Sequence, residues 1–320
     1  MLGLGNSLVG GVVSAPQSEF SVLFDGTNDH IKTGGDASTK PTSAMTISSW
    51  VNMDTSVGGY GWPNPDGSDV HNQFIVGCVA VGGFGLNISY AGTAANPLTY
   101  INVIAKVTDN SSGSAGYLHA YYWDKDDFGP ETSAANAGVN VAVADGSPKG
   151  VIGVNWGGHT ATNGSLTLSV IKDLTGFVHV ATTWGAGVMK LYVNGVLKRT
   201  ADTGVSSGNN IVYQADDARE VMIGADLSSG STAAEYLDGL IDDVAIWDAA
   251  IDADGITEIY GAGPLGLDLT AASGNYDNQG DLQGWWKLDE GTGTSAADSS
   301  TNSNTGTLVN GPTWSTITAG

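Results

Sequence analysis

Paired carboxylates are the first chemistry to look for, because glycoside hydrolysis places one acidic side chain as acid and a second as base or nucleophile across a cleft. The six glutamates of the chain are Glu19, Glu131, Glu220, Glu235, Glu258 and Glu290, and they are widely separated in sequence. A pair of aspartates from distant loops stays open as an alternative. The sequence therefore predicts a protein without enzymatic activity.

A helix-flanked calcium loop is the second candidate chemistry. Asp252, Asp254, Gly255 and Glu258 follow part of the EF-hand order. That motif also needs a further ligand before the glycine, a glutamate further along and two flanking helices. Because these parts are missing, residues 252–260 are better interpreted as a short helix with Asp252 near its N-terminal cap.

Composition excludes several classes of partner. The chain has 320 residues, with 33 acidic against 11 basic residues and a net charge of −22. Such a charge repels phosphate backbones and anionic membranes, so we expect no nucleic acid partner. No segment approaches the roughly 20 apolar residues that span a bilayer, so we expect no membrane insertion. The single cysteine, Cys78, lies in FIVGCVAV and is predicted to be a buried apolar residue.

Nearly all the hydrophobic runs alternate with a period of two, which is typical of strands. Strands are predicted at 20–26, 45–53, 74–81, 84–90, 99–107, 116–123, 138–144, 150–156, 166–171 and 177–184. Asn194-Gly195 separates two further alternating runs, and this pair predicts a tight type I′ hairpin. Many strands with one short helix indicate an all-β, two-sheet sandwich or jelly roll.

Several motifs in this order resemble the laminin-G-like, concanavalin A-type jelly rolls. They are FDGTNDHI, MTISSWV, TGFVHVATTW, MKLYVNG, VMIG and YLDGLIDDVAIWDAAIDADGITEIY. The resemblance implies a jelly roll at 19–265, from which the enlarged 56–165 region departs, and a C-terminal segment at 266–320 that completes the sandwich. The glycine-rich stretch before the jelly roll predicts a flexible arm at 1–18. The order also resembles that of jelly-roll proteins of marine bacteriophage particles.

The segment WWKLDEGTGTSAADSSTNSNTGTLVNGPTW ends the chain, whereas in this family it usually precedes the FDG strand. We predict that residues 283–289 still pair within their own subunit beside the FDG strand, since the ends of a sandwich often lie close together. Trp285 and Trp286 should then point to opposite faces. The alternative is a strand donated to a neighbouring subunit, which would make a homo-oligomer.

The resemblance also implies a structural Ca²⁺ ion that ties the strand LIDDVAIW to the turn after the first strand. Asp242 would supply its carboxylate, and Gly26 or Asp25 would supply backbone oxygens. Asp243 is the alternative in register, because adjacent strand residues point to opposite faces. If these residues bind no ion, they end strands and cap turns.

Sugar binding is the other recurrent task that the resemblance implies, with aromatic rings stacking on the sugar and polar groups fixing its hydroxyls. The stretch GGYGWPNPDGSD offers Trp62 and Tyr60. The stretch YYWDKDDFG offers Tyr121, Tyr122, Asp126 and Asp127. The tryptophans on strands are expected to fill the core instead.

Three functions follow from the sequence and the resemblance. The first is a non-enzymatic decoration protein on a bacteriophage virion, docked to other virion proteins through residues 1–18 and displaying a jelly roll that binds host or environmental glycans. The second is a carbohydrate-binding module of a secreted bacterial protein, and the weakest is a glycoside hydrolase. The expected location is the virion surface or the extracellular space.

Overall fold

A computed structural model describes residues 20–34, 37–53, 71–78, 83–93, 96–109, 114–122, 154–156, 159–160, 176–202, 210–211, 213, 220–227, 233–264 and 266–317. The predicted arm at 1–18 lies outside these residues, as do the predicted strands at 138–144 and 166–171 and the side chains of most of the 56–165 region. No helix in the described part is long and apolar enough to cross a membrane.

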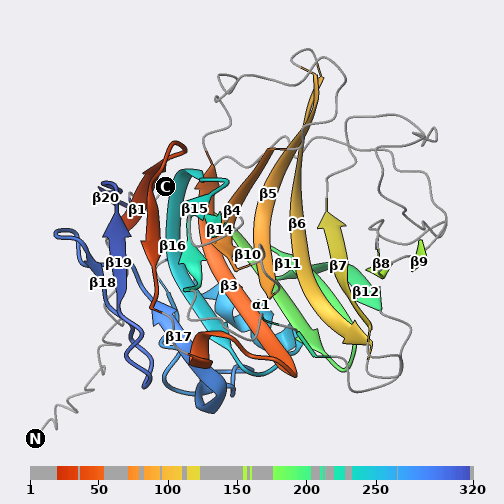
Figure 1. The fold of residues 1–320 in the computed structure, drawn as a ribbon. Coiled ribbons are helices and arrows are strands. Elements are labelled where there is room, and N and C mark those ends of the chain that lie inside the picture. The colour runs from red at the N-terminus through yellow and green to blue at the C-terminus, as the bar shows by residue number, and fades with distance from the viewer. Residues whose placement is uncertain are drawn as a thin grey trace, which may run out of the picture.

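The described strands form two large antiparallel sheets that pack as a sandwich (Figure 1). Sheet A has the order β12 (Val196–Asp202), β11 (Val188–Val193), β10 (Val178–Gly185), β3 (Ala44–Met53), β16 (Asp238–Trp247), β1 (Phe20–Asp25) and β20 (Thr313–Thr316), and β17 (Leu282–Trp286) also pairs with β16. The predicted all-β, two-sheet concanavalin A-like sandwich is confirmed.

Sheet B is the longer of the two. Its order is β18 (Ser295–Ala296), β19 (Gly306–Val309), β2 (His30–Lys32), β13 (Met222–Ile223), β4 (His71–Gly77), β5 (Phe84–Thr93), β6 (Asn96–Asp109), β7 (Ser114–Tyr122), β8 (Val154–Trp156) and β9 (His159–Thr160). The described strands of the enlarged region, β4 to β9, therefore follow one another across this sheet and extend it away from β2. A small hairpin of β14 (Asp226–Leu227) and β15 (Ala233–Ala234) stands apart.

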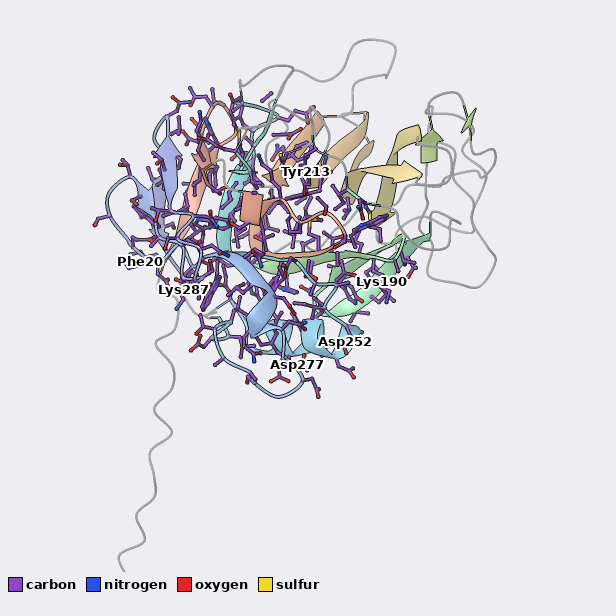
Figure 2. All side chains as sticks on the ribbon, turned by 60° about the horizontal axis from the view of Figure 1, so that its bottom comes forward. Phe20, Lys190, Tyr213, Asp252, Asp277 and Lys287 are labelled. Atoms are coloured by element: carbon purple, nitrogen blue, oxygen red, sulfur yellow. The ribbon has the colours of Figure 1, made fainter. Side chains whose placement is uncertain are left out.

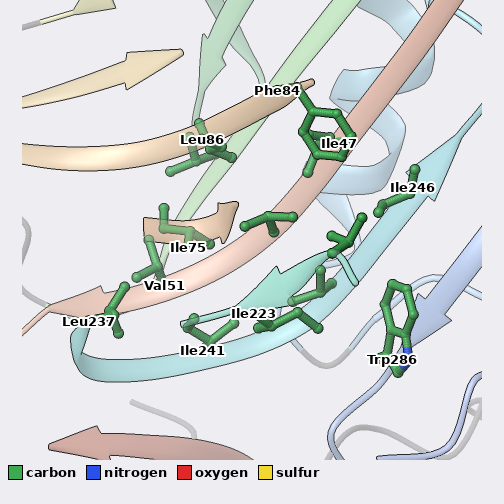
Figure 3. Packing of buried hydrophobic residues seen from close by; sticks show 14 of the residues in the cluster. Ile47, Val51, Ile75, Phe84, Leu86, Ile223, Leu237, Ile241, Ile246 and Trp286 are labelled. Atoms are coloured by element: carbon green, nitrogen blue, oxygen red, sulfur yellow. The ribbon is translucent and has the colours of Figure 1, made fainter. Parts of the chain in front are cut away.

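The main core fills the space between the two sheets, and Figure 3 shows part of it. Ile47 and Val51 of β3 and Ile241 and Ile246 of β16 are fully or almost fully buried there. Cys78 is also fully buried in this core, as predicted. Alternation explains the positions in β3, since every second side chain faces the opposite sheet. In β16 a bulge between Asp242 and Ala245 shifts the alternation by one residue, so Ile241 and Ile246 share the inner face.

A second apolar cluster lies on the other face of sheet A. There Trp247 and Trp285 pack beneath α1 (Ala253–Gly261) and the segment that follows it, together with Ile256 and Tyr276. Asp252 caps the helix, because its side chain accepts a hydrogen bond from the Gly255 N–H at 2.8 Å. The predicted helix and its cap are confirmed, with the helix one residue later than expected.

The C-terminal segment closes both sheets within one chain. Strand β17 pairs with β16 at Val244–Trp247, and β1 pairs with the same edge of β16 at Asp238–Ile241, so the two strands lie end to end. Trp286 points into the main core and Trp285 into the second cluster, as the alternation predicts. Two further strands of the segment, β18 and β19, extend sheet B, and β20 pairs with β1.

The hairpin between β11 and β12 has the predicted turn. Asn194 and Gly195 have φ angles of 49° and 72°, the positive values that a type I′ turn requires. A Cβ atom at Gly195 would lie 2.7 Å from Cδ1 of Tyr260, so the turn also packs closely against α1. Several boundaries differ from expectation. The strand predicted at 74–81 is β4, which begins at His71 and ends at Gly77, and the strand predicted at 99–107 is the longer β6, Asn96–Asp109.

Candidate functional site

The strands β5, β6 and β7 have one apolar face and one polar, aromatic face. Direct pairing joins Leu86 to Val103 and Val103 to Ala120, and these positions belong to the inner face, where Leu86 and Val103 are buried. Neighbouring inner positions are also apolar, such as Ile88 and Ile101. The remaining positions of the three strands therefore belong to the outer face of sheet B.

The outer-face positions carry amides, tyrosines and a histidine. Asn87 of β5 pairs with Asn102 of β6, and Asn102 pairs with Tyr121 of β7, which makes one continuous row across the strands. We call the full set the amide–tyrosine face. It consists of Asn87, Ser89, Tyr100, Asn102, Ile104, Lys106, Tyr117, His119, Tyr121 and Asn155.

These residue types suit a polyhydroxylated ligand. An amide both donates and accepts hydrogen bonds, so it can bind a hydroxyl in either role. A tyrosine combines an apolar ring with a polar hydroxyl. The face thus offers both kinds of group at neighbouring register positions, held by the backbone of three long strands.

The amide–tyrosine face has a defined limit on the β4 side. Phe74 and Asn87 are buried, with 2% and 1% of their surface exposed. At Gly77 a Cβ atom would lie 2.5 Å from the carbonyl oxygen of Ala225, so the segment around Ala225 lies directly against β4. The positions on β6 and β7 therefore form the part of the face that is farthest from this covering segment.

The two predicted tyrosines occupy different faces. Tyr121 pairs with Asn102 and belongs to the amide–tyrosine face, whereas Tyr122 pairs with Ile101 and belongs to the inner face. The predicted ligand residues Tyr60, Trp62, Asp126 and Asp127 lie outside the described residues.

Sequence reasoning missed the asparagines of the row. The sequence predicts the strands TYINVIAKV and GYLHAYYW, but it does not show which of their polar positions lie side by side. The signal was present, because every second residue of 100–106 and of 117–121 is polar, aromatic or cationic apart from Ile104. What the sequence did not supply is the register that aligns Asn102 with Tyr121.

The residues proposed for calcium are not brought together. Asp25 pairs with Asp238, and Asp242 lies four residues further along β16. At roughly 3.3 Å per strand residue, that spacing is about 13 Å, too far for Asp242 and the backbone oxygens of Asp25 or Gly26 to hold one ion. Within the described residues no group of three His, Cys, Asp or Glu side chains is arranged to hold a metal. Calcium binding at other residues stays a prediction.

Asp243, the alternative calcium ligand, has a different set of contacts. It lies at a β-bulge in β16 with a φ angle of 50°, and its carboxylate accepts a hydrogen bond from the indole N–H of Trp285. The ammonium of Lys287 lies 4.2 Å from the centre of the Trp285 ring. Burial raises the pKa of Asp243 to about 6, against the lowering effect of the Trp285 hydrogen bond; Asp289 raises it further and Lys287 lowers it.

A serine–histidine pair lies on the helix-covered side of sheet A. The Oγ of Ser48 and Nε2 of His179 are 2.8 Å apart, and the rings of Trp50 and Tyr260 pack around the histidine. Ser48 and His179 are almost completely buried. Burial lowers the pKa of His179 to about 3, so the ring is neutral at physiological pH. The pair is therefore part of the packing between sheet and helix and does not face solvent.

Comparison with known proteins supports the fold. Residues 111–257 match the family model described as the concanavalin A-like lectin/glucanases superfamily, of laminin G type. A proposed carbohydrate-binding protein from Bacteroides ovatus has a similar structure, with 17% identity, a TM-score of 0.50, and coverage of 95% of this chain and 61% of that chain. The present chain thus spans about three fifths of that protein, and at this identity the likeness shows the fold alone.

Two further solved structures are similar at a lower level. The CBM40 of Ruminococcus gnavus IT-sialidase, bound to α2,3-sialyllactose, is 14% identical with a TM-score of 0.36, over 77% of this chain and 98% of that one. Domains LG4-5 of the mouse laminin α1 chain are 10% identical with a TM-score of 0.36, over 73% and 46%. No curated protein sequence matches the chain.

Proposed function

We propose that this chain is a non-enzymatic, lectin-like jelly roll that binds glycans through the amide–tyrosine face and is displayed on the surface of a bacteriophage particle. The observation that carries the proposal is the direct pairing of Asn102 with Tyr121 at outer positions of β6 and β7 in sheet B. The match of residues 111–257 to a lectin and glucanase family supports it.

The row offers what a sugar ring needs. Tyr121 supplies an aromatic ring on which the apolar side of a pyranose can stack, and Asn102 beside it supplies a donor and an acceptor for hydroxyls. Both positions belong to long strands paired on both sides, which hold a site more firmly than loops do. The loop residues Trp62 and Tyr60 are proposed to add ring contacts. Asp126 and Asp127 are proposed to fix hydroxyls together with a calcium ion, which orders the loops and offsets the charge of the two carboxylates.

The arrangement of the chain ends suits display on a particle. Phe20 pairs with Thr316, so the chain enters and leaves the described fold at the same edge of sheet A. Figure 1 shows β1 and β20 on one side of the molecule and β7 to β9 on the opposite side. A domain held by residues 1–18 would thus present the amide–tyrosine face away from its attachment, and a net charge of −22 would keep crowded copies soluble.

A glycan panel screened with the full chain, in calcium and again in EDTA, tests the binding function. Tyr121→Ala should weaken binding about tenfold, which corresponds to one lost ring contact, and Tyr121→Phe should keep it because the ring remains. Unchanged binding by a folded Tyr121→Ala variant would place the site elsewhere. Silence of the unmodified chain across a broad panel would refute the glycan function.

Removal of residues 1–18 tests the display. The truncated chain should lose docking to particles and keep its glycan binding. If it docks as well as the full chain, the arm is not the attachment, and the alternative of a carbohydrate-binding module in a secreted bacterial protein gains support.

A further inference from the structure

The six strands that build and flank the amide–tyrosine face are nearly free of carboxylates. Asp109 is the single acidic residue in β4 to β9, in a chain with 33 acidic residues. It pairs with Ser114 and belongs to the same face as Val103 and Val107, so it is on the inner side of the sheet. The outer positions of these strands carry no carboxylate at all.

Strand structure alone does not explain this exclusion. Aspartate is generally depleted in strands, and that preference applies equally to both sheets. Yet the strands of sheet A carry Asp25, Asp202, Asp238, Asp242 and Asp243. Asp109 is the one acidic residue in all the named strands of sheet B, so the difference distinguishes the strands of sheet B from those of sheet A.

Cationic and hydrogen-bond-donating residues occupy the same face. Lys106, one of 11 basic residues in the chain, pairs directly with Tyr117. His119 pairs with Ile104, two residues along the strands from the Lys106–Tyr117 pair, and lies two residues from Tyr121. Asn102 and Tyr121 thus lie at one end of this set and Lys106 and Tyr117 at the other, four residues or about 13 Å along the strands, with His119 between them. The outer positions of β6 and β7 carry no carboxylate.

We propose that the amide–tyrosine face selects acidic sugars, in which a carboxylate or a sulfate on the sugar is bound near Lys106. The proposal rests on the glycan-binding function proposed above and names its ligand class. The Lys106 ammonium can donate a charge-assisted hydrogen bond to either anion, whereas carboxylates beside the site would repel the anion. The acidic residues elsewhere on the chain still repel anions. At physiological salt this repulsion is screened beyond about 8 Å, so it acts only on anionic groups close to those residues.

Short oligosaccharides are therefore the expected ligands, with one or a few anionic groups, and long polyanions such as nucleic acids are not. A short ligand can lie on the amide–tyrosine face alone. A long polyanion would also cross surface that carries the net charge of −22.

Matched pairs of ligands that differ only in charge test the selection. The first pair is trigalacturonate and its methyl ester, which isolates a carboxylate. The second is 3′-sulfolactose and lactose, which isolates a sulfate. In calorimetric titrations of the full chain at physiological salt, the charged member of at least one pair should bind about tenfold more tightly, the size of one charge-assisted hydrogen bond.

Three variants assign the effect to this face. Lys106→Gln should remove the preference for the charged member, and Lys106→Arg should keep that preference. Lys190→Gln removes the same charge from β11 of sheet A, where Figure 2 labels it, and should change nothing. Asn102→Asp keeps Lys106 and adds a carboxylate to the face, so it should weaken binding of the charged member more than binding of the neutral member.

The outcomes separate this inference from the proposed function. Equal binding of both members of each pair, lost in Tyr121→Ala, would overturn the charge selection and keep the glycan function. Absence of binding to either pair and to the wider panel would overturn both. A preference that survives Lys106→Gln, or that Lys190→Gln removes equally, would show that the charge effect does not come from this face.

Discussion

Replacement of the buried Asp243 by asparagine should stabilise the protein at neutral pH. The carboxyl is 5% exposed and accepts the indole hydrogen bond of Trp285. Asparagine keeps an oxygen at that position for the same hydrogen bond, and it tolerates the φ angle of 50° better than most residues. The substitution therefore changes mainly the charge of the side chain, in a place where burial opposes charge.

The magnitude follows from the pKa of the carboxyl. Burial raises the pKa of Asp243 from 3.8 to about 6. The folded state then binds this proton more tightly than the unfolded state, so the contribution of Asp243 to stability is fully present below pH 3.8 and is lost as the pH rises through 6. The loss is about 3 kcal/mol, since one pKa unit corresponds to about 1.4 kcal/mol. The asparagine variant cannot lose it.

Urea unfolding followed by tryptophan fluorescence at a series of pH values from 4 to 8 measures the effect. The stability of Asp243→Asn minus that of the unmodified chain should rise by up to about 3 kcal/mol between pH 4 and pH 7 and then stay level. A constant offset, from small packing changes, does not affect this rise. Asp277→Asn, at an exposed position of the segment after α1, controls for the loss of one negative charge.

The stability of the variant must be compared with that of the unmodified chain at each pH, because another buried group changes the stability of both proteins with pH in the opposite direction. The pKa of His179 is lowered to about 3, so its contribution to stability is present above pH 6.5 and is lost as the pH falls. It is common to both proteins and cancels in the subtraction. A difference that is independent of pH, or that falls between pH 4 and pH 7, would refute the reasoning about Asp243.

Two further predictions concern packing and hydrogen bonding. Gly224→Ala should lower the free energy of unfolding by about 1–3 kcal/mol more than Gly34→Ala in the same assay. Both glycines have a φ angle of 80°, so the backbone strain is matched. A Cβ atom at Gly224 would lie 2.5 Å from the Phe24 ring, whereas a Cβ atom at Gly34 would have no neighbour within 4 Å. Equal losses would show that the core yields to the extra methyl. Asp298→Ala should lower the free energy of unfolding by about 3 kcal/mol or more, because the carboxylate accepts four hydrogen bonds in the C-terminal segment. Glu290→Ala, at an exposed residue whose side chain accepts a single hydrogen bond from Ala297, should cost much less; comparable losses would contradict the role of Asp298.

Short sequence patterns predict most of the described strands, turns and helix, because each of these depends on the conformational preferences of neighbouring residues. The alternation of apolar residues gave the strands, and it also assigned Trp285 and Trp286 to opposite faces. Asn194-Gly195 predicted its turn because few other residues accept two positive φ angles in succession. Asp252 predicted the start of α1, since its side chain satisfies a backbone N–H that the helix leaves free.

The candidate site depends on register, which local patterns do not contain. Tyr121 was among the predicted ligand residues, but its separation from Tyr122 and its alignment with Asn102 require the pairing of β6 with β7. The same limitation explains the calcium ligands. Asp242 and Asp25 lie on neighbouring strands, and only the pairing of Val22 with Ile241 shows how far apart along them they are.

The bulge at Asp243 has a cause that becomes clear only from the C-terminal segment. Strand β1 ends its pairing with β16 at Ile241, and β17 begins its pairing at Val244. The two residues between, Asp242 and Asp243, lie where one partner strand gives way to another. The register of β16 against β3 shifts at the same place, so the bulge accommodates the junction.

This junction explains how a segment that usually comes first can close the sandwich from the other end of the chain. Strand β1 is enclosed by distant parts of the sequence, since it pairs with β16 on one side and β20 on the other, and the Phe20 ring lies against Gly291. The edge of β16 is filled by β1 and β17 together, so it does not matter to the sheet which of the two the chain reaches first. It does matter to folding, because pairing Phe20 with Thr316 closes almost the whole chain into a loop. The first strand can therefore complete its hydrogen bonds only after the last segment is in place, which makes the C-terminal segment the element that decides when the sandwich is finished.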